Sequence, residues 1–482
     1  MDKLVVARVL SVMTFSLFGT LFFPMLLALF MEDAVGGSVF LLIMVITLII
    51  SFELKSYSHG VSKNARLQVK DGVAITTFGW ILISVLGMLP YFLSGELRVL
   101  DAFLESVSGF AGVGGTVATD VTGFSPAILL WRSLTNWIGG LGIILLFMAI
   151  IPQKGAFFMI KAENSFASER ELPKVRNHAK AIFAIYAALT FLCFDTFVIL
   201  GADGFSAVNH ALTTVSTGGF SVFNDGLMTY NNPNIELAAA VFMIVSAVSF
   251  PLYLTAVRKG AKELFKSTEL RAFLAIIVAA TTLITLDLFL NGRNEFFGGL
   301  HLAFFHVASL SSTTAFTTDD FDTWPALSKG ILLFLMFVGG CAGSTAGGVK
   351  IFRIVLLSKM IGVILRQKLH PQQIITAKMN GKTVPDEIFF GAARLFFATL
   401  LIDAAFAGFL ILNGVNSDDS ILVAISTMAS VGPGFGIEGA MSNYSLLPDF
   451  AKLTAAAVMI LGRLEIFTAL VFFTRDFWET DW

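Results

Sequence analysis

The sequence predicts an all-α polytopic membrane protein, in which an N-terminal helix pair precedes four similar helix–loop–helix units around a central pore. Hydrophobic residues make up 56% of the 482 residues, charged residues make up 14%, and the mean hydropathy is +0.81. A soluble domain of this length could not bury so much apolar surface. The other two observations are a series of apolar segments long enough to cross a bilayer and a short motif that recurs four times.

Ten apolar segments are expected to cross the membrane, since one span needs about twenty residues. Within the first segment, Lys3 and Arg8 precede an apolar run from Val9 to Met31, which is too long for the hydrophobic region of a signal peptide, so we interpret it as a retained helix. The segments cover residues 4–31, 36–54, 72–95, 127–152, 178–201, 234–258, 269–291, 328–366, 386–413 and 452–474, and the eighth is interrupted.

The loops between these segments alternate in charge. Basic loops lie within residues 55–70, 154–180, 258–271 and 350–382, whereas the loops on the other side carry mainly acids, such as Asp203, Asp320 and Asp419. Positively charged loops remain in the cytoplasm. We therefore expect a multi-pass protein of the plasma membrane with both termini in the cytoplasm.

The recurring motif is rich in glycine and hydroxyl residues, and its copies lie roughly a hundred residues apart, which is typical of an internal repeat. The copies are Ala111-Gly112-Val113-Gly114-Gly115-Thr116, Val215-Ser216-Thr217-Gly218-Gly219-Phe220, Ser312-Thr313-Thr314-Ala315-Phe316 and Ala429-Ser430-Val431-Gly432-Pro433-Gly434. We align them on Gly114, Gly218, Ala315 and Gly432. Each follows an apolar segment too short to span a bilayer, at residues 99–110, 205–214, 297–311 and 418–428, which indicates a re-entrant half-helix.

These observations divide the chain into five parts. Residues 1–71 form an N-terminal two-helix extension, and four pore repeats follow at residues 72–153, 154–260, 261–370 and 371–482. Each repeat is expected to contain a spanning helix, a half-helix, a loop and a second spanning helix, and the third repeat carries an intramembrane gating loop.

Four such loops, all on the outer side, indicate one shared cavity, because non-helical backbone at membrane depth requires surrounding protein or water. We expect their backbone carbonyls to replace the hydration shell of a monovalent cation in a central ion pore. Glycine reaches the required dihedral angles at low cost, and Ser and Thr add hydroxyl oxygens. The alternative is that the glycines only permit close helix packing. The predicted ion ligands are Gly112, Val113, Gly114, Ser216, Thr217, Gly218, Thr313, Thr314, Ala315, Ser430, Val431 and Gly432.

A glycine-rich run interrupts the eighth apolar segment. It cannot hold a firm helix, since each glycine costs about 1 kcal/mol relative to alanine. We interpret it as a gate that moves in the permeation path, and the alternative is a packing kink. The predicted gating residues are Gly339, Gly340, Gly343, Ser344, Thr345, Gly347, Gly348 and Lys350, together with Arg463.

Arg463 lies inside the last apolar segment. A buried arginine in a membrane usually marks a pathway or a partner. It would either repel cations below the loops or hold the gating loop by bonding its carbonyls. An ion pair with an acid on a neighbouring helix is the third possibility.

Several motifs resemble the Trk/Ktr/HKT superfamily of potassium transporters, most closely the bacterial Trk-type membrane subunit. The resemblance extends over nearly the whole chain, including the N-terminal helix pair. The motifs are Thr135-Asn136-Trp137-Ile138-Gly139-Gly140-Leu141-Gly142, Thr217-Gly218-Gly219-Phe220, Thr313-Thr314-Ala315-Phe316-Thr317-Thr318, the run from Gly339 to Lys350, Val431-Gly432-Pro433-Gly434-Phe435-Gly436 and Leu461-Gly462-Arg463-Leu464-Glu465-Ile466.

The resemblance implies a homodimer in the bacterial inner membrane, with four pseudo-repeats around each pore. It implies uptake of potassium, which is bound in the loops while it is transported, and no covalently bound cofactor. It also implies that the run from Gly339 to Gly348 is the gate, that Arg463 corresponds to the family arginine of the last helix, and that a cytosolic ring of nucleotide-binding subunits controls opening.

The chain departs from the family pattern at Ala315, where glycine is usual, and at Ala111-Gly112-Val113, where Thr-rich versions are usual. A methyl group restricts positive φ, so we expect measurable sodium or rubidium permeation. A sodium- or proton-coupled potassium symporter on the same scaffold is the alternative function. An enzyme would need a nucleophile with a base or a metal motif such as H-E-x-x-H, and the sequence contains neither.

Overall fold

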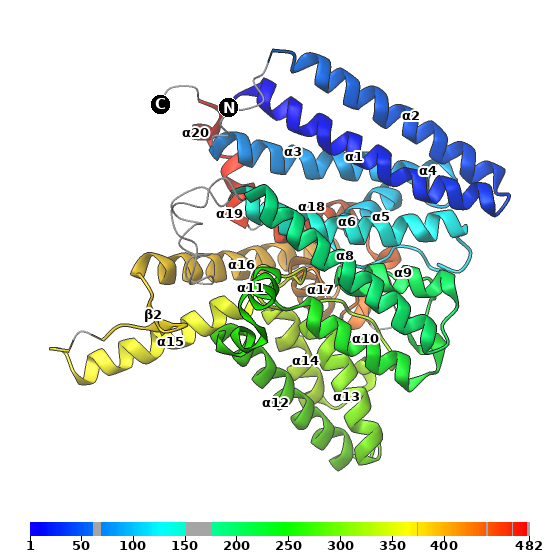
Figure 1. Cartoon of the computed structure of the whole chain (residues 1–482). Coiled ribbons are helices and arrows are strands. Elements are labelled where there is room, and N and C mark those ends of the chain that lie inside the picture. The colour runs from blue at the N-terminus through cyan, green and yellow to red at the C-terminus, as the bar shows by residue number, and fades with distance from the viewer. Residues whose placement is uncertain (61–68, 151–174, 374, 440–441, 465, 480–482) are drawn as a thin grey trace.

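The computed structural model consists almost entirely of α-helices (Figure 1), which confirms the predicted fold class. It describes residues 1–60, 69–150, 175–373, 375–439, 442–464 and 466–479. The predicted repeat boundary at 153/154, the basic residues at 154–174 and Glu465 lie outside the described residues. A short antiparallel ladder between β1 (Lys378–Met379) and β2 (Lys382–Thr383), which the sequence analysis did not predict, precedes the fourth unit.

The N-terminal extension is an antiparallel pair, α1 (Lys3–Phe30) and α2 (Ala34–Tyr57). The side chain of Asp33 begins α2 by accepting a hydrogen bond of 2.8 Å from the Gly36 amide. The pair lies along one side of the molecule, where α1 packs against α3 and α6 (Figure 1).

Four units with a similar order of helices follow. The first contains α3 (Val69–Gly87), α4 (Leu89–Leu93), α5 (Val99–Ala111) and α6 (Pro126–Ile150), and the second contains α8 (Val175–Ile199), α9 (Gly204–Val215), α10 (Pro233–Ser246) and α11 (Phe250–Lys259). The third contains α12 (Thr268–Leu290), α13 (Phe296–Ser311), α14 (Ala326–Val338) and α15 (Ile351–Leu369), and the fourth contains α16 (Asp386–Leu412), α17 (Ser417–Met428), α18 (Asp449–Arg463) and α19 (Ile466–Phe472). Short helices lie in connections or near the C-terminus. They are η2 (Met228–Tyr230), η3 (Ala261–Lys266), η4 (Phe321–Thr323), η5 (Gly436–Glu438), η6 (Tyr444–Leu446) and α20 (Arg475–Trp478).

The units are arranged in a ring. In each, the half-helix packs on the first spanning helix of its own unit, as α5 does on α3 and α9 on α8. The second helix then packs on the half-helix of the next unit: α6 on α9, α10 on α13, α14 on α17 and α18 on α5. The last of these contacts joins the fourth unit to the first, so the ring is closed.

Within the described residues, six helices are long and apolar enough to cross a membrane, and two bent helix pairs raise the number to eight. The prediction of one continuous span at 234–258 was wrong, because α10 and α11 meet at 87°. Pro251 in the first turn of α11 lacks the amide that would continue the helix. The prediction at 452–474 was also wrong in this respect, because α18 ends at Arg463 and α19 begins at Ile466.

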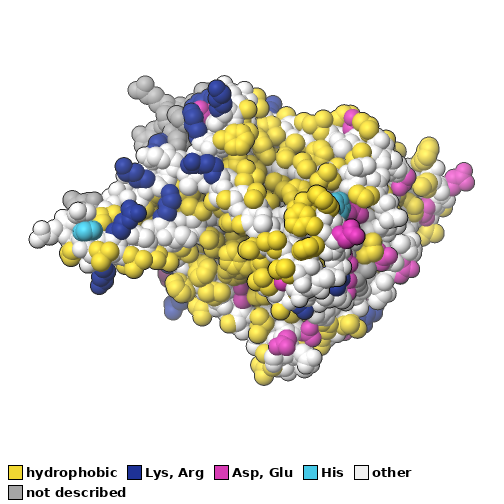
Figure 2. All heavy atoms as spheres, turned by 90° about the horizontal axis from the view of Figure 1, so that it is seen from below, with side chains coloured by type: hydrophobic (Ala, Val, Ile, Leu, Met, Phe, Trp, Pro, Cys, Tyr) yellow, Lys and Arg dark blue, Asp and Glu magenta, His cyan; other side chains and the backbone are white. Residues whose placement is uncertain are grey.

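The start of α1 and helix α20 lie on the same side of the molecule (Figure 1). The Lys70 ammonium donates to the carbonyl of Asp476 at 2.8 Å, and the Asp2 amide donates to Asp71 at 2.7 Å. Figure 2 shows Lys and Arg side chains gathered at the left, Asp and Glu at the right, and a hydrophobic band between them. This segregation is typical of a membrane protein whose basic and acidic surfaces face the aqueous phases on opposite sides of the bilayer.

Candidate ion-binding loops and gate

The four half-helices are α5, α9, α13 and α17, and each begins and ends within one residue of the predicted segment. Each runs toward the centre of the ring of units, and a motif loop follows its C-terminal end. We call these filter loops 1 to 4, comprising residues 112–118, 216–222, 312–318 and 429–436. The negative end of each helix dipole therefore lies at a filter loop, where it favours a cation.

A repeated backbone pattern defines the filter loops. In each, two residues with positive φ are separated by one residue: Gly112 and Gly114 (65° and 74°), Thr217 and Gly219 (52° and 76°), Thr313 and Ala315 (59° and 56°), and Ser430 and Gly432 (56° and 82°). The pattern pairs Gly114 with Gly219, so the predicted alignment on Gly218 is displaced by one residue. Thr217, Thr313, Ala315 and Ser430 are non-glycine residues with positive φ. Such strain is concentrated at functional sites, which makes the filter loops candidate sites.

The filter loops meet one another. A methyl group added at Gly114 would clash with the carbonyl oxygen of Gly218, and one added at Gly219 would clash with that of Thr314. One added at Gly432 would clash with the carbonyl oxygen of Val113. Loop 1 therefore lies beside loop 2, loop 2 beside loop 3, and loop 4 beside loop 1, in the same order as the ring of units.

Buried hydroxyl and amide groups hold the filter loops from behind. Ser108 donates to the carbonyl of Gly115 at 2.6 Å, and Ser309, which is at the equivalent position in the third unit, donates to the carbonyl of Phe316 at 2.7 Å. Asn136 on α6 accepts a hydrogen bond of 3.2 Å from the Phe220 amide. These contacts fix the orientation of the loop backbone.

The glycine-rich run is non-helical, as predicted. Helix α14 ends at Val338, Gly339 has a φ of 70°, and α15 begins after Lys350, whose φ is 79°. We call residues 339–350 the gating loop. It touches three filter loops or the half-helices that carry them. These contacts are Thr345 Oγ1 to Val215 O (3.3 Å), Gly347 N to Thr313 Oγ1 (2.7 Å) and Gly348 N to Ala429 O (2.9 Å).

Arg463 connects the gating loop to the remaining unit. Its side chain is 3% exposed, and it donates to the carbonyls of Thr345 at 2.9 Å and Gly139 at 3.2 Å. Gly139 belongs to α6 of the first unit. These contacts support the role in which Arg463 holds the gating loop by bonding its carbonyls. They do not support the ion-pair alternative, because Arg463 forms no ion pair in the described part of the chain.

Three charged residues that position these loops were not predicted from the sequence. Glu269 in the first turn of α12 accepts hydrogen bonds from the amides of Ala342 at 2.7 Å and Phe352 at 3.2 Å, and so ties the first part of the gating loop to the first turn of α15. Glu105 and Arg132 form a buried ion pair behind filter loop 1. The available signal was an isolated charge in an otherwise apolar segment.

A cavity of about 50 Å³, which has room for a few water molecules, lies between the gating loop and filter loop 4. Its lining includes Gly347, Ser430, Arg463 and Asp403. Asp403 is buried on α16, and its Oδ1 has no hydrogen-bond partner among the described residues.

Two acids hold the end of filter loop 4 and the residue that follows it. Asp322 accepts from the Gly436 amide at 3.1 Å, and Asp419 accepts from the Ile437 amide at 3.1 Å. Burial raises the pKa of Asp322 above its usual range, whereas hydrogen bonds from Thr122 and Asn224 lower the pKa of the exposed Asp120. Part of the acidic surface is therefore structural.

Residues 36–479 match the family described as TrkH, cation transport protein. The chain belongs to this family. TrkH-family proteins are transporters, so the chain is not an enzyme.

Individual TrkH-family proteins resemble the whole chain. The "Trk system potassium uptake protein TrkH" of Halomonas elongata is 33% identical over 98% of both chains. Its namesake in Escherichia coli K12 is 30% identical over 98% of this chain and 99% of its own length. The crystal structure of the potassium transporter TrkH from Vibrio parahaemolyticus superposes with a TM-score of 0.91 at 30% identity, covering 99% of this chain and 100% of that one.

Proposed function

We propose that this chain is the ion-conducting transmembrane subunit of a Trk-type potassium uptake system, and that potassium passes through the ring of filter loops. The names of its full-length relatives, which are potassium uptake proteins, support potassium as the substrate. The observation that carries the proposal is the ring itself, in which four loops with paired positive φ angles meet at the C-terminal ends of four half-helices.

The proposed ligands are backbone carbonyls and hydroxyls of the filter loops. They comprise Gly112, Val113, Gly114, Ser216, Thr217, Gly218, Thr313, Thr314, Ala315, Ser430, Val431 and Gly432, and the dihedral pattern adds Gly219 as the equivalent of Gly114. Neutral carbonyls replace the hydration shell without a net charge that would trap the ion. Rubidium and sodium are proposed as further permeant ions because Ala315 occupies a position that favours glycine.

The gating loop is proposed to close the pathway on the inner side of the filter loops. Its contacts with Val215, Thr313 and Ala429 support this role, since they connect it to three units at once. Arg463 joins it to the first unit through the carbonyl of Gly139. In this proposal the pathway opens when these hydrogen bonds break and the loop moves aside.

Further parts of the proposal concern assembly and orientation. We propose a homodimer in the bacterial inner membrane, regulated by a cytosolic ring of nucleotide-binding subunits, with the chain divided into a two-helix extension and four pore repeats. Both termini are assigned to the cytoplasm, because Asp2 and Asp476 contact Asp71 and Lys70 at the end of a basic loop, and positive loops remain inside.

The test is ion uptake by the purified chain in liposomes. Potassium-loaded liposomes should accumulate rubidium when they contain the protein and not when they lack it, and a sodium gradient should leave the rate unchanged. Absence of protein-dependent rubidium uptake, with the protein intact and inserted, would contradict the proposed function. A rate that requires the sodium gradient would favour the coupled symporter.

A further inference from the structure

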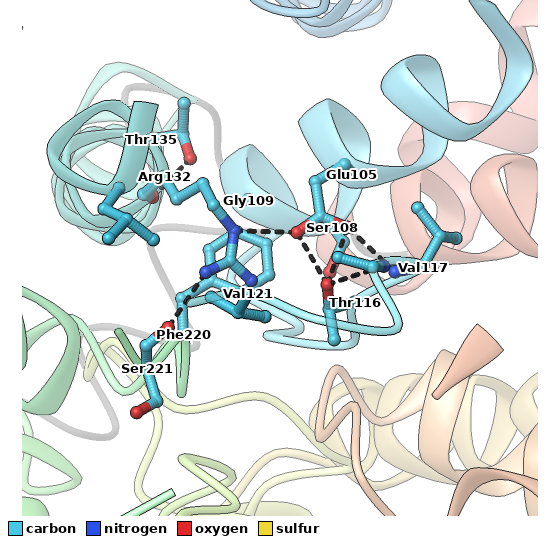
Figure 3. Close-up of polar contacts among 12 residues, drawn as sticks. Glu105, Ser108, Gly109, Thr116, Val117, Val121, Arg132, Thr135, Phe220 and Ser221 are labelled. Carbon is cyan, nitrogen blue, oxygen red and sulfur yellow. Dashed lines mark hydrogen bonds and ion pairs between the residues drawn. The ribbon is translucent and has the colours of Figure 1, made fainter. Parts of the chain in front are cut away.

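A buried ion pair lies behind filter loop 1 (Figure 3). Glu105 on α5 and Arg132 on α6 are 2.8 Å apart, with side-chain exposures of 0% and 2%. Removing two charges from water is expensive, so such a pair is stable only when further hydrogen bonds use the remaining lone pairs and protons. The identity of those further partners indicates what the pair does.

The Glu105 carboxylate binds filter loop 1 beyond its positive-φ residues. The Thr116 hydroxyl lies 2.9 and 3.0 Å from its two oxygens, and the Val117 amide donates to Oε2 at 2.9 Å. Three groups therefore converge on one carboxylate, as the dashed lines in Figure 3 show. Hydrogen bonds to an ionised acceptor are about twice as strong as neutral ones.

The Arg132 guanidinium reaches filter loop 2. It donates to the carbonyl of Ser221 at 2.9 Å, and its central carbon lies 4.2 Å from the centroid of the Phe220 ring. Both residues directly follow Gly219, which meets filter loop 3. The ion pair therefore joins two adjacent filter loops through one continuous polar contact.

The other units differ at the same position. The residue seven positions before the first positive-φ residue is Glu105 in the first unit, His210 in the second, His306 in the third and Val423 in the fourth. His210 contacts Ser221, the equivalent of Thr116, at 3.0 Å. The Nε2 of His306 has no partner among the described residues, and Val423 has no polar atom to offer. Polar support from this position is thus confined to loops 1 and 2.

We propose that Glu105 and Arg132 are positioning residues for ion selectivity. They act through Thr116, Val117 and Ser221, and they hold loops 1 and 2 at the spacing that suits potassium. The inference rests on the proposed function, since it assigns a determinant of selectivity to the same pore. An ion pair that only stabilised the packing of α5 on α6 would affect folding and leave selectivity unchanged.

The chain contains a matched control on the same half-helix. Asp101 and Lys452 form an ion pair of 2.8 Å with side-chain exposures of 12% and 4%, and it joins α5 to α18. The contacts of this pair lead to Arg98 and not to a filter loop. Asp101→Asn and Glu105→Gln each remove one buried negative charge from α5 with minimal change of shape.

The experiment compares potassium and sodium uptake in liposomes for the unmodified chain, Glu105→Gln and Asp101→Asn. The ratio of potassium to sodium uptake should fall about tenfold in Glu105→Gln, the change expected when about 1.4 kcal/mol of charge-assisted hydrogen bonding is lost. It should be unchanged in Asp101→Asn. In Glu105→Gln/Arg132→Met, thermal stability should recover because no unpaired charge remains, while the ratio stays low.

Thr116→Val decides the matter if Glu105→Gln does not fold, because it removes a loop contact and leaves the ion pair intact. It should also lower the ratio. The inference is overturned if Thr116→Val, or Glu105→Gln in folded protein, keeps the ratio of the unmodified chain, or if Asp101→Asn lowers it equally. Absence of uptake by the unmodified chain overturns the proposed function instead, and the inference with it.

Discussion

The filter loops and the gating loop are both non-helical backbone at membrane depth, yet they are held in different ways. In every filter loop, the residue between the two positive-φ positions donates its amide to its own half-helix: Val113 to Ser108, Gly218 to Thr213, Thr314 to Ser309 and Val431 to Ser426, at 2.9 to 3.0 Å. The gating loop instead takes many of its bonds from other units, as Gly348 does from Ala429 and Thr345 from Val215 and Arg463.

The difference indicates which region can move alone. A filter loop cannot shift without breaking the end of its own half-helix, and its glycines have no free space around them. The contacts of the gating loop with other units lie outside α14 and α15, so breaking them leaves the hydrogen bonds of both helices intact. Local bonds therefore suit a fixed binding site, and bonds between units suit a gate.

Gly432→Ala should break the filter side of this comparison and have the largest effect. Gly432 has a φ of 82°, and a methyl group there would meet the Val113 carbonyl and the Gly115 amide. The positive φ alone costs alanine about 1–2 kcal/mol. Rubidium uptake in liposomes should be lost. Gly408→Ala on α16, with no atom within 4 Å of the added group, is the control and should retain uptake.

Arg463→Gln should break the gating side. It removes charge-assisted hydrogen bonds to Thr345 and Gly139, each of which contributes about 1.5–3 kcal/mol. Uptake without any regulatory subunit should rise at least about tenfold, since about 1.4 kcal/mol corresponds to that factor. Arg394→Gln, at an exposed position of α16, should leave the rate unchanged. A rate in Arg463→Gln no higher than that of the unmodified chain would argue against the proposed role of Arg463 in holding the gating loop closed.

Thr345→Val also weakens the contacts that hold the gating loop, but it removes a weaker interaction. It removes a neutral hydroxyl that lies within hydrogen-bond distance of the carbonyls of Val215 and Ser246. A neutral hydrogen bond contributes about 0.5–1.5 kcal/mol, so the basal uptake rate should rise by about threefold to tenfold. Ser344→Ala, which loses a bond inside the gating loop to Cys341, should change the rate less, and an equal effect would remove the distinction between the two kinds of bond.

Ala315→Gly should sharpen the filter and have the smallest effect. Alanine at a φ of 56° is strained by about 1–2 kcal/mol, and glycine relieves that strain. The expected result is a higher permeability ratio of potassium to sodium, measured from reversal potentials in mixed solutions. The same ratio in both proteins would show that the methyl group does not limit selectivity.

The sequence alone determined the class of protein, the half-helices and the places where the chain leaves the helical state. Apolar length fixes which segments can cross a bilayer, and clustered glycines cannot sustain a helix, so residues 99–110 and 339–348 were identified from local properties. The resemblance to the Trk branch was likewise carried by short motifs and is confirmed by the full-length match.

Only the tertiary structure decided the register of loop 2 and the partners of the buried charges. Thr217 takes the positive φ that local preference would give to a glycine, because its neighbours in the ring fix the backbone. Glu105 meets Arg132, and Arg463 meets Thr345 and Gly139, across separations that no periodicity encodes. A charge in an apolar segment signals that a partner is needed, whereas the packing of units around the ring determines which partner it finds.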